Sequence, residues 1–387
     1  MWIERRLKDK IFRSAGSRPV VLLTGARQTG KSSLLTRLFP ESRYITFDYL
    51  RQVEAARESP QQFLQQCSGN IILDEIQYVP ELFRELKILV DKERDTYGKW
   101  VITGSQRFEL MEQVSESLAG RISIINLETL SAMELRESNL QPLDDFLWRG
   151  GYPELWSNPH LEAEDFFENY IRTYIERDLK QIVEVKNLND FRRFIRILAA
   201  RIGQLINYRD IAKDVGIADV TVKRWLHALE MGGLVYLLPP FFSNIGKRLV
   251  KTPKLYFSDH GLACYLLGIV DAETWSRHMF RGNLWENVVL MELIKNNYLV
   301  PGRELFFYRD QNGVEIDFII EQGSRLTLLE AKAGETIDNR KLNFNKVAPL
   351  LQKNYQIECV VAHTPPDNTI VKLKNYSSFN PLKVNFA

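Results

Sequence analysis

The residues with the most specific chemistry lie between positions 20 and 35, which read VVLLTGARQTGKSSLL. The apolar residues 20–23 predict a short buried strand, and residues 33–35 begin a helix. Between them, residues 25–32 match the pattern of a phosphate-binding loop, G-x-x-x-x-G-K-S. Backbone N–H groups of such a loop and of the first helical turn point at one spot, where they can bind phosphate oxygens. The stretch therefore predicts a nucleotide site, and a chance glycine loop is the alternative.

Individual residues of this loop have separate expected roles. Gly25 and Gly30 allow the turn and the close approach of the backbone, because a Cβ atom would occupy the space or forbid the dihedral angles. Lys31 is expected to reach the β- and γ-phosphates of ATP, and the Ser32 hydroxyl is expected to bind Mg²⁺. The expected nucleotide-binding residues are Gly25, Ala26, Arg27, Gln28, Thr29, Gly30, Lys31, Ser32 and Ser33.

A second stretch, residues 70–75 with the sequence NIILDE, ends an apolar strand with two consecutive acids. In a Walker B pattern the first acid, Asp74, holds the hydrated Mg²⁺, and the second, Glu75, orients and deprotonates the attacking water. Two acids at a strand end could also belong to a solvated loop. Their position after a phosphate-binding loop favours the catalytic interpretation.

Small polar residues follow another predicted buried strand, residues 99–103. Because the carboxyl ends of parallel strands meet at the ligand crevice, Thr103 or Ser105 could lie beside the γ-phosphate and the water as a polar sensor. Ser105 is the residue of the two that we assign to catalysis. The alternative is a helix cap or a turn made by Gly104 and Ser105.

Arg121 lies between a predicted helix, residues 108–119, and a predicted strand, residues 122–127. An arginine at this place could project from the edge of a subunit and stabilise transition-state charge on the nucleotide of a neighbouring subunit. This hypothesis predicts a homo-oligomer. A surface salt bridge is the competing interpretation.

The order of these features resembles the AAA+ ATPases over about residues 15–135. The remainder resembles one prokaryotic branch of that superfamily, in which a helical linker, a winged helix and a restriction-endonuclease-like domain follow the AAA+ module. The resemblance implies an α/β P-loop sandwich, a helical lid, a winged helix-turn-helix and a carboxy-terminal α/β nuclease-like domain. The expected domain ranges are 1–140, 141–189, 190–258 and 259–387.

The middle of the chain has the pattern of a helix-turn-helix. Residues 208–215 and 219–231 predict two helices joined by a short glycine turn, and residues 234–238 and 254–257 predict the strands of a wing. A rigid spacer or a subunit contact with Trp225 in its core is the alternative to a DNA-binding unit. In the DNA-binding interpretation the major groove faces Thr221, Lys223, Arg224 and His227, and phosphates contact Lys247, Arg248, Lys251 and Lys254.

The carboxy-terminal part contains a third set of acids. Strand alternation places Glu330 and Lys332 on one face, and Asp317 lies on the adjoining strand. The arrangement resembles the PD-(D/E)xK nuclease core, although the proline that usually precedes the aspartate is missing. Asp317, Glu330 and Glu286 are then the expected Mg²⁺ ligands, and Lys332 would position or activate the water. The alternatives are a surface ion pair and a nuclease fold without activity.

The composition of the whole chain limits its partners. Of 387 residues, 51 are Lys or Arg and 49 are Asp or Glu, so any nucleic-acid contact must come from a local patch. The three cysteines are far apart, which argues against a disulfide framework and against a zinc cluster. The start lacks the apolar core of a signal peptide, and no run approaches the roughly 20 apolar residues that span a bilayer. We therefore expect a cytoplasmic protein without membrane contact.

These observations predict an ATPase that hydrolyses ATP with Mg²⁺ as a homo-oligomer and couples its nucleotide state to carboxy-terminal domains directed at DNA. The alternative is a nucleotide-gated switch or scaffold that binds protein partners and contains an inactive nuclease fold. Cleavage of DNA by the nuclease-like domain is left open.

Overall fold

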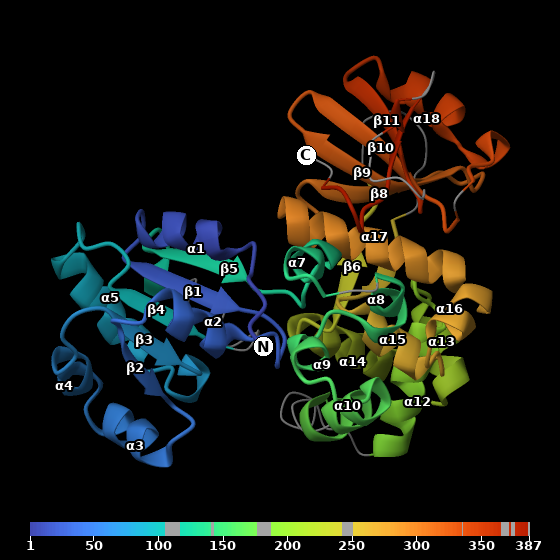
Figure 1. Ribbon diagram of the computed structural model, residues 1–387. Helices are drawn as coiled ribbons and strands as arrows, with labels where there is room; N and C mark the ends of the chain where they lie inside the picture. Colours follow the sequence, from blue (N-terminus) through green and yellow to red (C-terminus); the bar gives the residue numbers. More distant parts are fainter. Residues whose placement is uncertain are drawn as a thin grey trace. The chain divides into compact units, whose positions relative to one another are not determined.

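The computed structural model describes residues 1–104, 117–140, 143–175, 187–241, 251–334, 336–364, 371–372 and 376–385. The chain divides into two compact units (Figure 1). The first unit contains Glu4–Thr129 and Met231–Gly233, and the second contains Met1–Ile3, Leu130–Glu230 and Leu234–Ala387. The domain borders expected at residues 140, 189 and 258 stay predictions.

The first unit is built on a five-stranded parallel sheet with the strand order β2-β3-β4-β1-β5. Strands β1, β3 and β4 are buried along their whole length, which is typical of parallel strands covered on both faces. Parallel strands end at the same edge, so the residues that follow β1 and β3 lie close together. The strands are β1 (Val20–Thr24), β2 (Arg43–Thr46), β3 (Ile71–Asp74), β4 (Trp100–Thr103) and β5 (Ile122–Asn126). The expected α/β core is confirmed.

Helices connect the strands of this sheet and complete its core. Leu22 from β1, Leu73 from β3 and Leu86 from α5 are fully buried in one apolar cluster, and this burial fixes the strands whose ends hold polar residues. The helices are α1 (Lys8–Ala15), α2 (Lys31–Leu38), α3 (Leu50–Glu58), α4 (Pro60–Gln65), the 3-10 helix η1 (Ile76–Tyr78) and α5 (Leu82–Lys92).

The second unit begins with a group of helices. α13 ends at Gly216, whose φ of +86° lies in the left-handed region, and strand β6 (Val235–Leu238) pairs antiparallel with β7 (Lys254–Phe257). Elements therefore form where the helix-turn-helix pattern places them, and their assignment as a winged helix stays a prediction. The helices are α7 (Ala132–Glu137), α8 (Leu143–Arg149), α9 (Pro153–Ser157), α10 (Ala163–Tyr170), the π-helix η2 (Ile171–Ile175), α12 (Leu188–Ala199), α13 (Tyr208–Val215), α14 (Asp219–Met231), α15 (His260–Leu266) and α16 (Ala272–Arg277).

The second unit ends with a long helix, α17 (Arg281–Asn297), and a six-stranded sheet of order β12-β13-β11-β10-β9-β8. Figure 1 shows α17 running along one side of this sheet. The indole N–H of buried Trp285 on α17 donates to the carbonyl of Ala362 at 3.1 Å, which fixes the helix to the sheet. The remaining elements are β8 (Leu305–Arg309), β9 (Glu315–Gln322), β10 (Arg325–Ala331), η3 (Asn339–Lys341), α18 (Phe344–Leu351), β11 (Gln356–Ala362), β12 (Val371–Lys372) and β13 (Ser377–Phe379).

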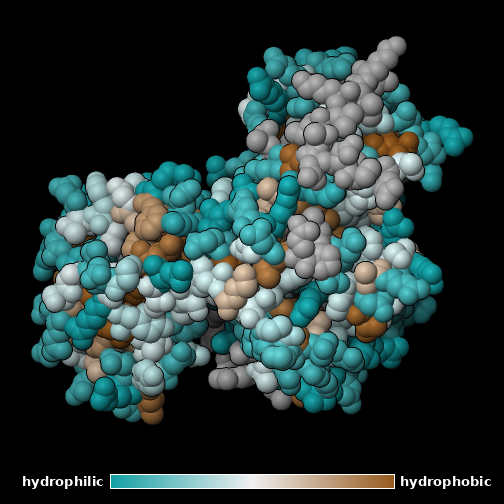
Figure 2. Space-filling view, viewed as in Figure 1, coloured by the Kyte–Doolittle hydropathy of each residue, from teal (hydrophilic) through white to brown (hydrophobic). Residues whose placement is uncertain are grey.

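The surface is mostly hydrophilic, with hydrophobic residues in small patches. Figure 2 shows hydrophobic residues in small, scattered patches among hydrophilic ones on the face in view. Single exposed apolar side chains, such as those of Leu50 (70%) and Met279 (84%), are ordinary on protein surfaces. Among the described residues, none of the helices combines the length and the hydropathy that a membrane span needs.

Asp259 joins two segments of the second unit. Its buried carboxylate accepts hydrogen bonds from the N–H groups of Gly261 (3.0 Å) and Leu262 (3.3 Å) at the start of α15, and from that of Gly151 (2.8 Å). Asp259→Ala removes the acceptor of all three, so we expect the free energy of unfolding to fall by about 2–4 kcal/mol. Asp271→Ala, which removes the exposed cap of α16, is the control, with an expected loss of about 1 kcal/mol. Denaturant titrations measure both, and equal losses would contradict the assignment.

Candidate functional site

The loop after β1 has a backbone that demands glycine. Gly25 has a φ of +139°, and a Cβ atom added there would lie 2.2 Å from the carbonyl oxygen of Leu127. Gly30 has a φ of +90° and directly precedes α2. The N–H groups of the first turn of α2 follow this glycine, so the loop has the geometry of an anion site.

Lys31 lies inside the loop. Its Nζ donates to the carbonyl oxygens of Gly25 (3.1 Å) and Ala26 (2.9 Å), and only 6% of the residue is exposed. Burial lowers the pKa of Lys31 to about 8. The Thr29 hydroxyl also donates to the Ala26 carbonyl at 3.0 Å, which tightens the turn. A phosphate in this loop would therefore meet a positioned ammonium group.

An arginine outside the loop donates hydrogen bonds that fix the loop backbone. Arg5 is 7% exposed, and its guanidinium donates to the carbonyls of Thr29 (2.9 Å) and Glu128 (2.5 Å). Arg5 reaches both carbonyls only because the fold brings together residues that are far apart in the sequence.

Asp74 is the centre of the site. The Ser32 hydroxyl donates to both of its carboxylate oxygens at 2.9 Å, the Tyr44 hydroxyl donates at 2.5 Å, and the Thr103 hydroxyl donates as well. A hydroxyl beside a carboxylate suits Mg²⁺, which keeps several waters and takes further ligands from phosphates. Ser32 and Asp74, the expected pair, are thus together. Burial, followed by the hydrogen bond to Asp74, raises the pKa of Tyr44.

Glu75 has a strained backbone. Its φ of +58° is in the left-handed region, which costs a residue with a side chain about 1–2 kcal/mol. Its N–H donates to the Thr103 hydroxyl at 3.0 Å, and its carboxylate accepts from Gln77. Thr103 therefore connects both acids of the strand end. Strain of this kind is common where a side chain has to be aimed at a reacting group.

For the other two residues expected to act in ATP hydrolysis, Ser105 and Arg121, the structure does not show the expected role. Ser105 lies outside the described residues. Arg121 makes a two-point ion pair with Asp91 of α5, with Nε–Oδ1 at 2.7 Å and Nη2–Oδ2 at 2.9 Å. The hydrogen bonds from Arg121 lower the pKa of Asp91. The structure thus contains the salt bridge of the competing interpretation, and the role of Arg121 toward a neighbouring subunit stays a prediction.

The expected nuclease-like residues come together on the carboxy-terminal sheet. The Lys332 ammonium lies 2.6 Å from a carboxylate oxygen of Glu330 and 3.4 Å from one of Asp317. Asp317 also accepts from the N–H of Ala331 at 2.8 Å, and Glu330 accepts from that of Asn343 at 3.0 Å. Burial, followed by the charge of Asp317, raises the pKa of Glu330 to about 7.

Asp317 also belongs to a second group of acids, which it forms with Glu286 and Glu315. Carboxylate oxygens of Glu286, Glu315 and Asp317 lie within 4.8 Å of one another. The Lys254 ammonium is 2.8 Å from Glu286 and 2.5 Å from Glu315, and Lys254 is 1% exposed. Burial alone would lower the pKa of Lys254, but the negative charges of these acids raise it above its usual value. Glu315 went unpredicted, although strand alternation places it on the face of Asp317.

Of the basic residues expected to contact DNA, some are exposed and one is buried. The prediction that Lys254 contacts phosphates is wrong, because its ammonium is buried among carboxylates. Lys223, Arg224 and His227 of α14 are exposed, whereas Trp225 between them is buried. Lys251 is exposed too, while Lys247 and Arg248 lie outside the described residues.

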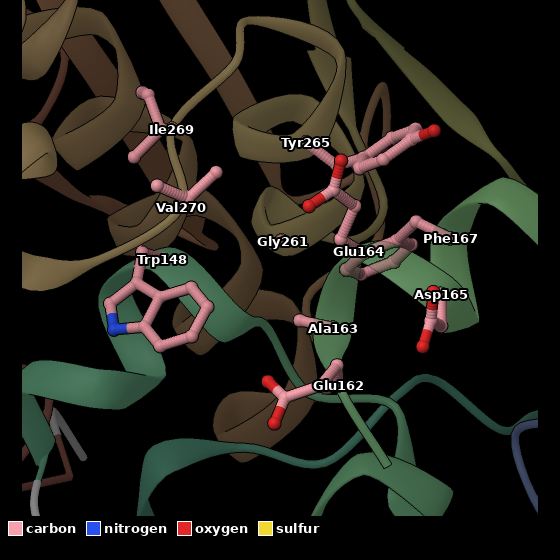
Figure 3. A pocket seen from close by; sticks show the side chains of 10 residues that line it. All are labelled: Trp148, Glu162, Ala163, Glu164, Asp165, Phe167, Gly261, Tyr265, Ile269 and Val270. Atoms are coloured by element: carbon pink, nitrogen blue, oxygen red, sulfur yellow. The ribbon is translucent and has the colours of Figure 1, made fainter.

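Two hollows of the second unit differ in charge. An open groove of about 890 Å³ is lined by four cationic side chains, those of Arg192, Arg193, Arg196 and Lys213, and by one acid, Asp214. A cavity of about 240 Å³ is lined instead by Trp148, Tyr265 and three acids (Figure 3). Figure 3 shows Trp148 and Glu162 on one side and Tyr265 with Glu164 on another. Its carboxylates would repel a phosphate, so this cavity does not suit a nucleotide.

Three segments of the chain match known domain families. Residues 17–136 match an AAA domain, and this match contains the loop, Asp74 and Glu75. Residues 140–273 match a domain of unknown function, DUF8612, and residues 281–375 match another, DUF4143. The first unit therefore contains an AAA-type P-loop ATPase domain.

Relatives cover most of the chain. It is 35% identical over 340 residues to the uncharacterized protein Rv2008c of Mycobacterium tuberculosis, which covers 87% of this chain and 75% of that protein. It is 23% identical over 346 residues to an uncharacterized protein of Haemophilus influenzae, covering 80% and 82%. Among solved structures, the Walker-type ATPase PABY2304 of Pyrococcus abyssi has a TM-score of 0.44 at 17% identity, covering 69% of this chain and 96% of that one.

The lowered pKa of Lys31 predicts a pH dependence of nucleotide affinity. A phosphate needs the charged ammonium, whose pKa is about 8 in the free protein, so above that pH binding requires uptake of a proton. We expect the Kd for ATP to be constant below about pH 7.5 and to rise up to tenfold per pH unit above pH 8. Lys31→Arg, which stays charged, should have a flat profile. Titration with a fluorescent ATP analogue measures this, and a flat wild-type profile from pH 7 to 10 would refute it.

Proposed function

We propose, for a chain that belongs to the same family as the Mycobacterium tuberculosis protein Rv2008c, that ATP is bound and hydrolysed at the loop of residues 25–32. The observation that supports this most is the hydrogen bond of Ser32 to Asp74, because Ser32 directly follows Lys31, whose ammonium is held inside the same loop. Mg²⁺ bound by Ser32 and Asp74 would neutralise phosphate charge. Lys31 would donate to the β- and γ-phosphates, and Glu75 would take a proton from the attacking water.

Substitutions at Lys31 and Glu75 separate binding from hydrolysis. Lys31→Ala removes the phosphate donor, so both nucleotide affinity and turnover should be lost. Glu75→Gln keeps the shape of the side chain but removes the base, so ATP should still bind while turnover falls by about 100-fold or more. Glu58→Gln, which changes an exposed glutamate of α3, is the matched control. Phosphate release and nucleotide titration measure the two effects, and a Glu75→Gln turnover within twofold of wild type would remove the assignment.

We further propose that the second unit contacts DNA and that the nucleotide state of the first unit controls this contact. The groove lined by Arg192, Arg193, Arg196 and Lys213 supports it, because clustered cations release counterions from a phosphate backbone. The exposed cations Lys223 and Arg224 of α14 support it too. The near-zero charge balance of the whole chain makes such local clusters the expected place for binding.

Charge reversal in the groove tests this proposal. Arg193→Glu combined with Arg196→Glu should weaken duplex or single-strand binding by at least about tenfold at 0.1 M salt and lower the salt dependence of the Kd. The control is Arg277→Glu with Arg303→Glu, two exposed arginines outside the groove. Fluorescence anisotropy gives the Kd, and ATP turnover with and without DNA gives the coupling. Equal loss in both double variants, or no DNA binding by wild type, would contradict the proposal.

A second candidate function is a nucleotide-gated switch that recruits protein partners and cuts nothing. One observation favours it over a nuclease. Glu286, one of the three Mg²⁺ ligands expected for a nuclease, is already paired with the ammonium of Lys254 at 2.8 Å, and this positive charge disfavours a divalent ion beside it.

A further inference from the structure

We infer that the ammonium of Lys254 is the cation of the carboxylate cluster at the carboxy-terminal sheet. The negative charge of this cluster is then neutralised by a side chain of the protein instead of by a divalent metal. The inference concerns Glu286, Glu315 and Asp317 and does not rest on ATP hydrolysis in the first unit.

The position of the ammonium is the first support. Three carboxylate oxygens within 4.8 Å of one another could surround one metal ion with metal–oxygen distances of about 2.0–2.6 Å. The Lys254 Nζ lies 2.8 Å from Glu286 and 2.5 Å from Glu315, and so already contacts two of the three carboxylates that such an ion would need. A metal and an ammonium cannot share that space, because both the contact distance and the like charges oppose it.

Further donors reach three oxygens of these carboxylates, namely Oε1 of Glu286, which Lys254 also contacts, Oε2 of Glu315 and Oδ2 of Asp317. The Tyr256 hydroxyl donates to Glu286, and Arg309 pairs with the second oxygen of Glu315 at 2.7 Å. Asp317 accepts from a backbone N–H and from Lys332. A divalent ion would have to replace charge-assisted hydrogen bonds that are already made, so it gains little in this site.

Lys254 itself is held in place by its surroundings. It lies on β7, opposite Leu238 of β6, and forms a bridge to Leu205 on the other side. Its ammonium lies 5.5 Å from the centre of the Phe307 ring, within the range of a cation–π contact. The side chain is thus an internal part of the unit that ties β7 to α17 and β9, and swinging it out to solvent would expose buried carboxylates without a counter-charge.

The test asks whether removal of this ammonium creates a metal site. Lys254→Ala is made in an Asp74→Asn background without nucleotide, so that Mn²⁺ at the first unit does not contribute. The parent should bind no Mn²⁺ at this cluster, and its Tm should shift by less than about 1 °C with Mn²⁺. Lys254→Ala should have a lower Tm than the parent, bind one Mn²⁺ by electron paramagnetic resonance titration, and regain about 3 °C or more with the metal.

Further variants locate the effect. Lys251→Ala, an exposed lysine on the same segment, should behave as the parent does. Glu315→Gln added to Lys254→Ala should abolish the gained Mn²⁺ binding. If the alanine variant does not fold, Lys254→Ser leaves room for a water ligand and is tested in the same way. Parent binding of Mn²⁺ that Glu286→Gln or Glu315→Gln removes would overturn the inference, as would a folded Lys254→Ala or Lys254→Ser variant that binds none.

Discussion

The arrangement of the first unit depends on the carboxylate of Asp74. It is 3% exposed, and a buried charge is tolerated only where donors surround it. Hydroxyl groups from Ser32, Tyr44 and Thr103 supply those donors from α2, β2 and β4. These elements meet at one point because β3 lies between β2 and β4 in a parallel sheet, with α2 starting at the end of β1. The order of the strands therefore determines the chemistry of the crevice.

Part of this site could be predicted from the sequence because its signals are local. The loop of residues 25–32 and the acids Asp74 and Glu75 are recognisable from spacing alone, and the structure places Ser32 against Asp74. Tyr44 could not be found in this way, since its contact requires β2 to pair with β3, and neither strand order nor register is written in a single strand. The sequence likewise left Thr103 and Ser105 as two candidates for the polar sensor, because the contact of Thr103 with Asp74 depends on the pairing of β4 with β3.

In the second unit, too, the contacts between neighbouring strands could be predicted from the sequence, whereas those that depend on tertiary packing could not. Asp317 and Glu330 lie on strands joined by a tight turn, and Lys332 directly follows the second strand, so alternation was enough to bring them together. Lys254 belongs to β7, whose position against β9 and α17 is set by tertiary packing. Its basic neighbours in the sequence suggested a solvent-exposed role at DNA. Its burial contradicts that interpretation, because Lys254 is the counter-ion of Glu286 and Glu315.

The central claim is that Asp74 and Ser32 hold the metal of a bound nucleotide. Its most direct test is the Mg²⁺ dependence of ATP affinity, measured by calorimetry for wild type and for Asp74→Asn. The account predicts that Mg²⁺ tightens ATP binding by at least about tenfold in wild type and has little effect in the variant. The same gain from Mg²⁺ in both proteins, or no ATP binding at all by wild type, would contradict it.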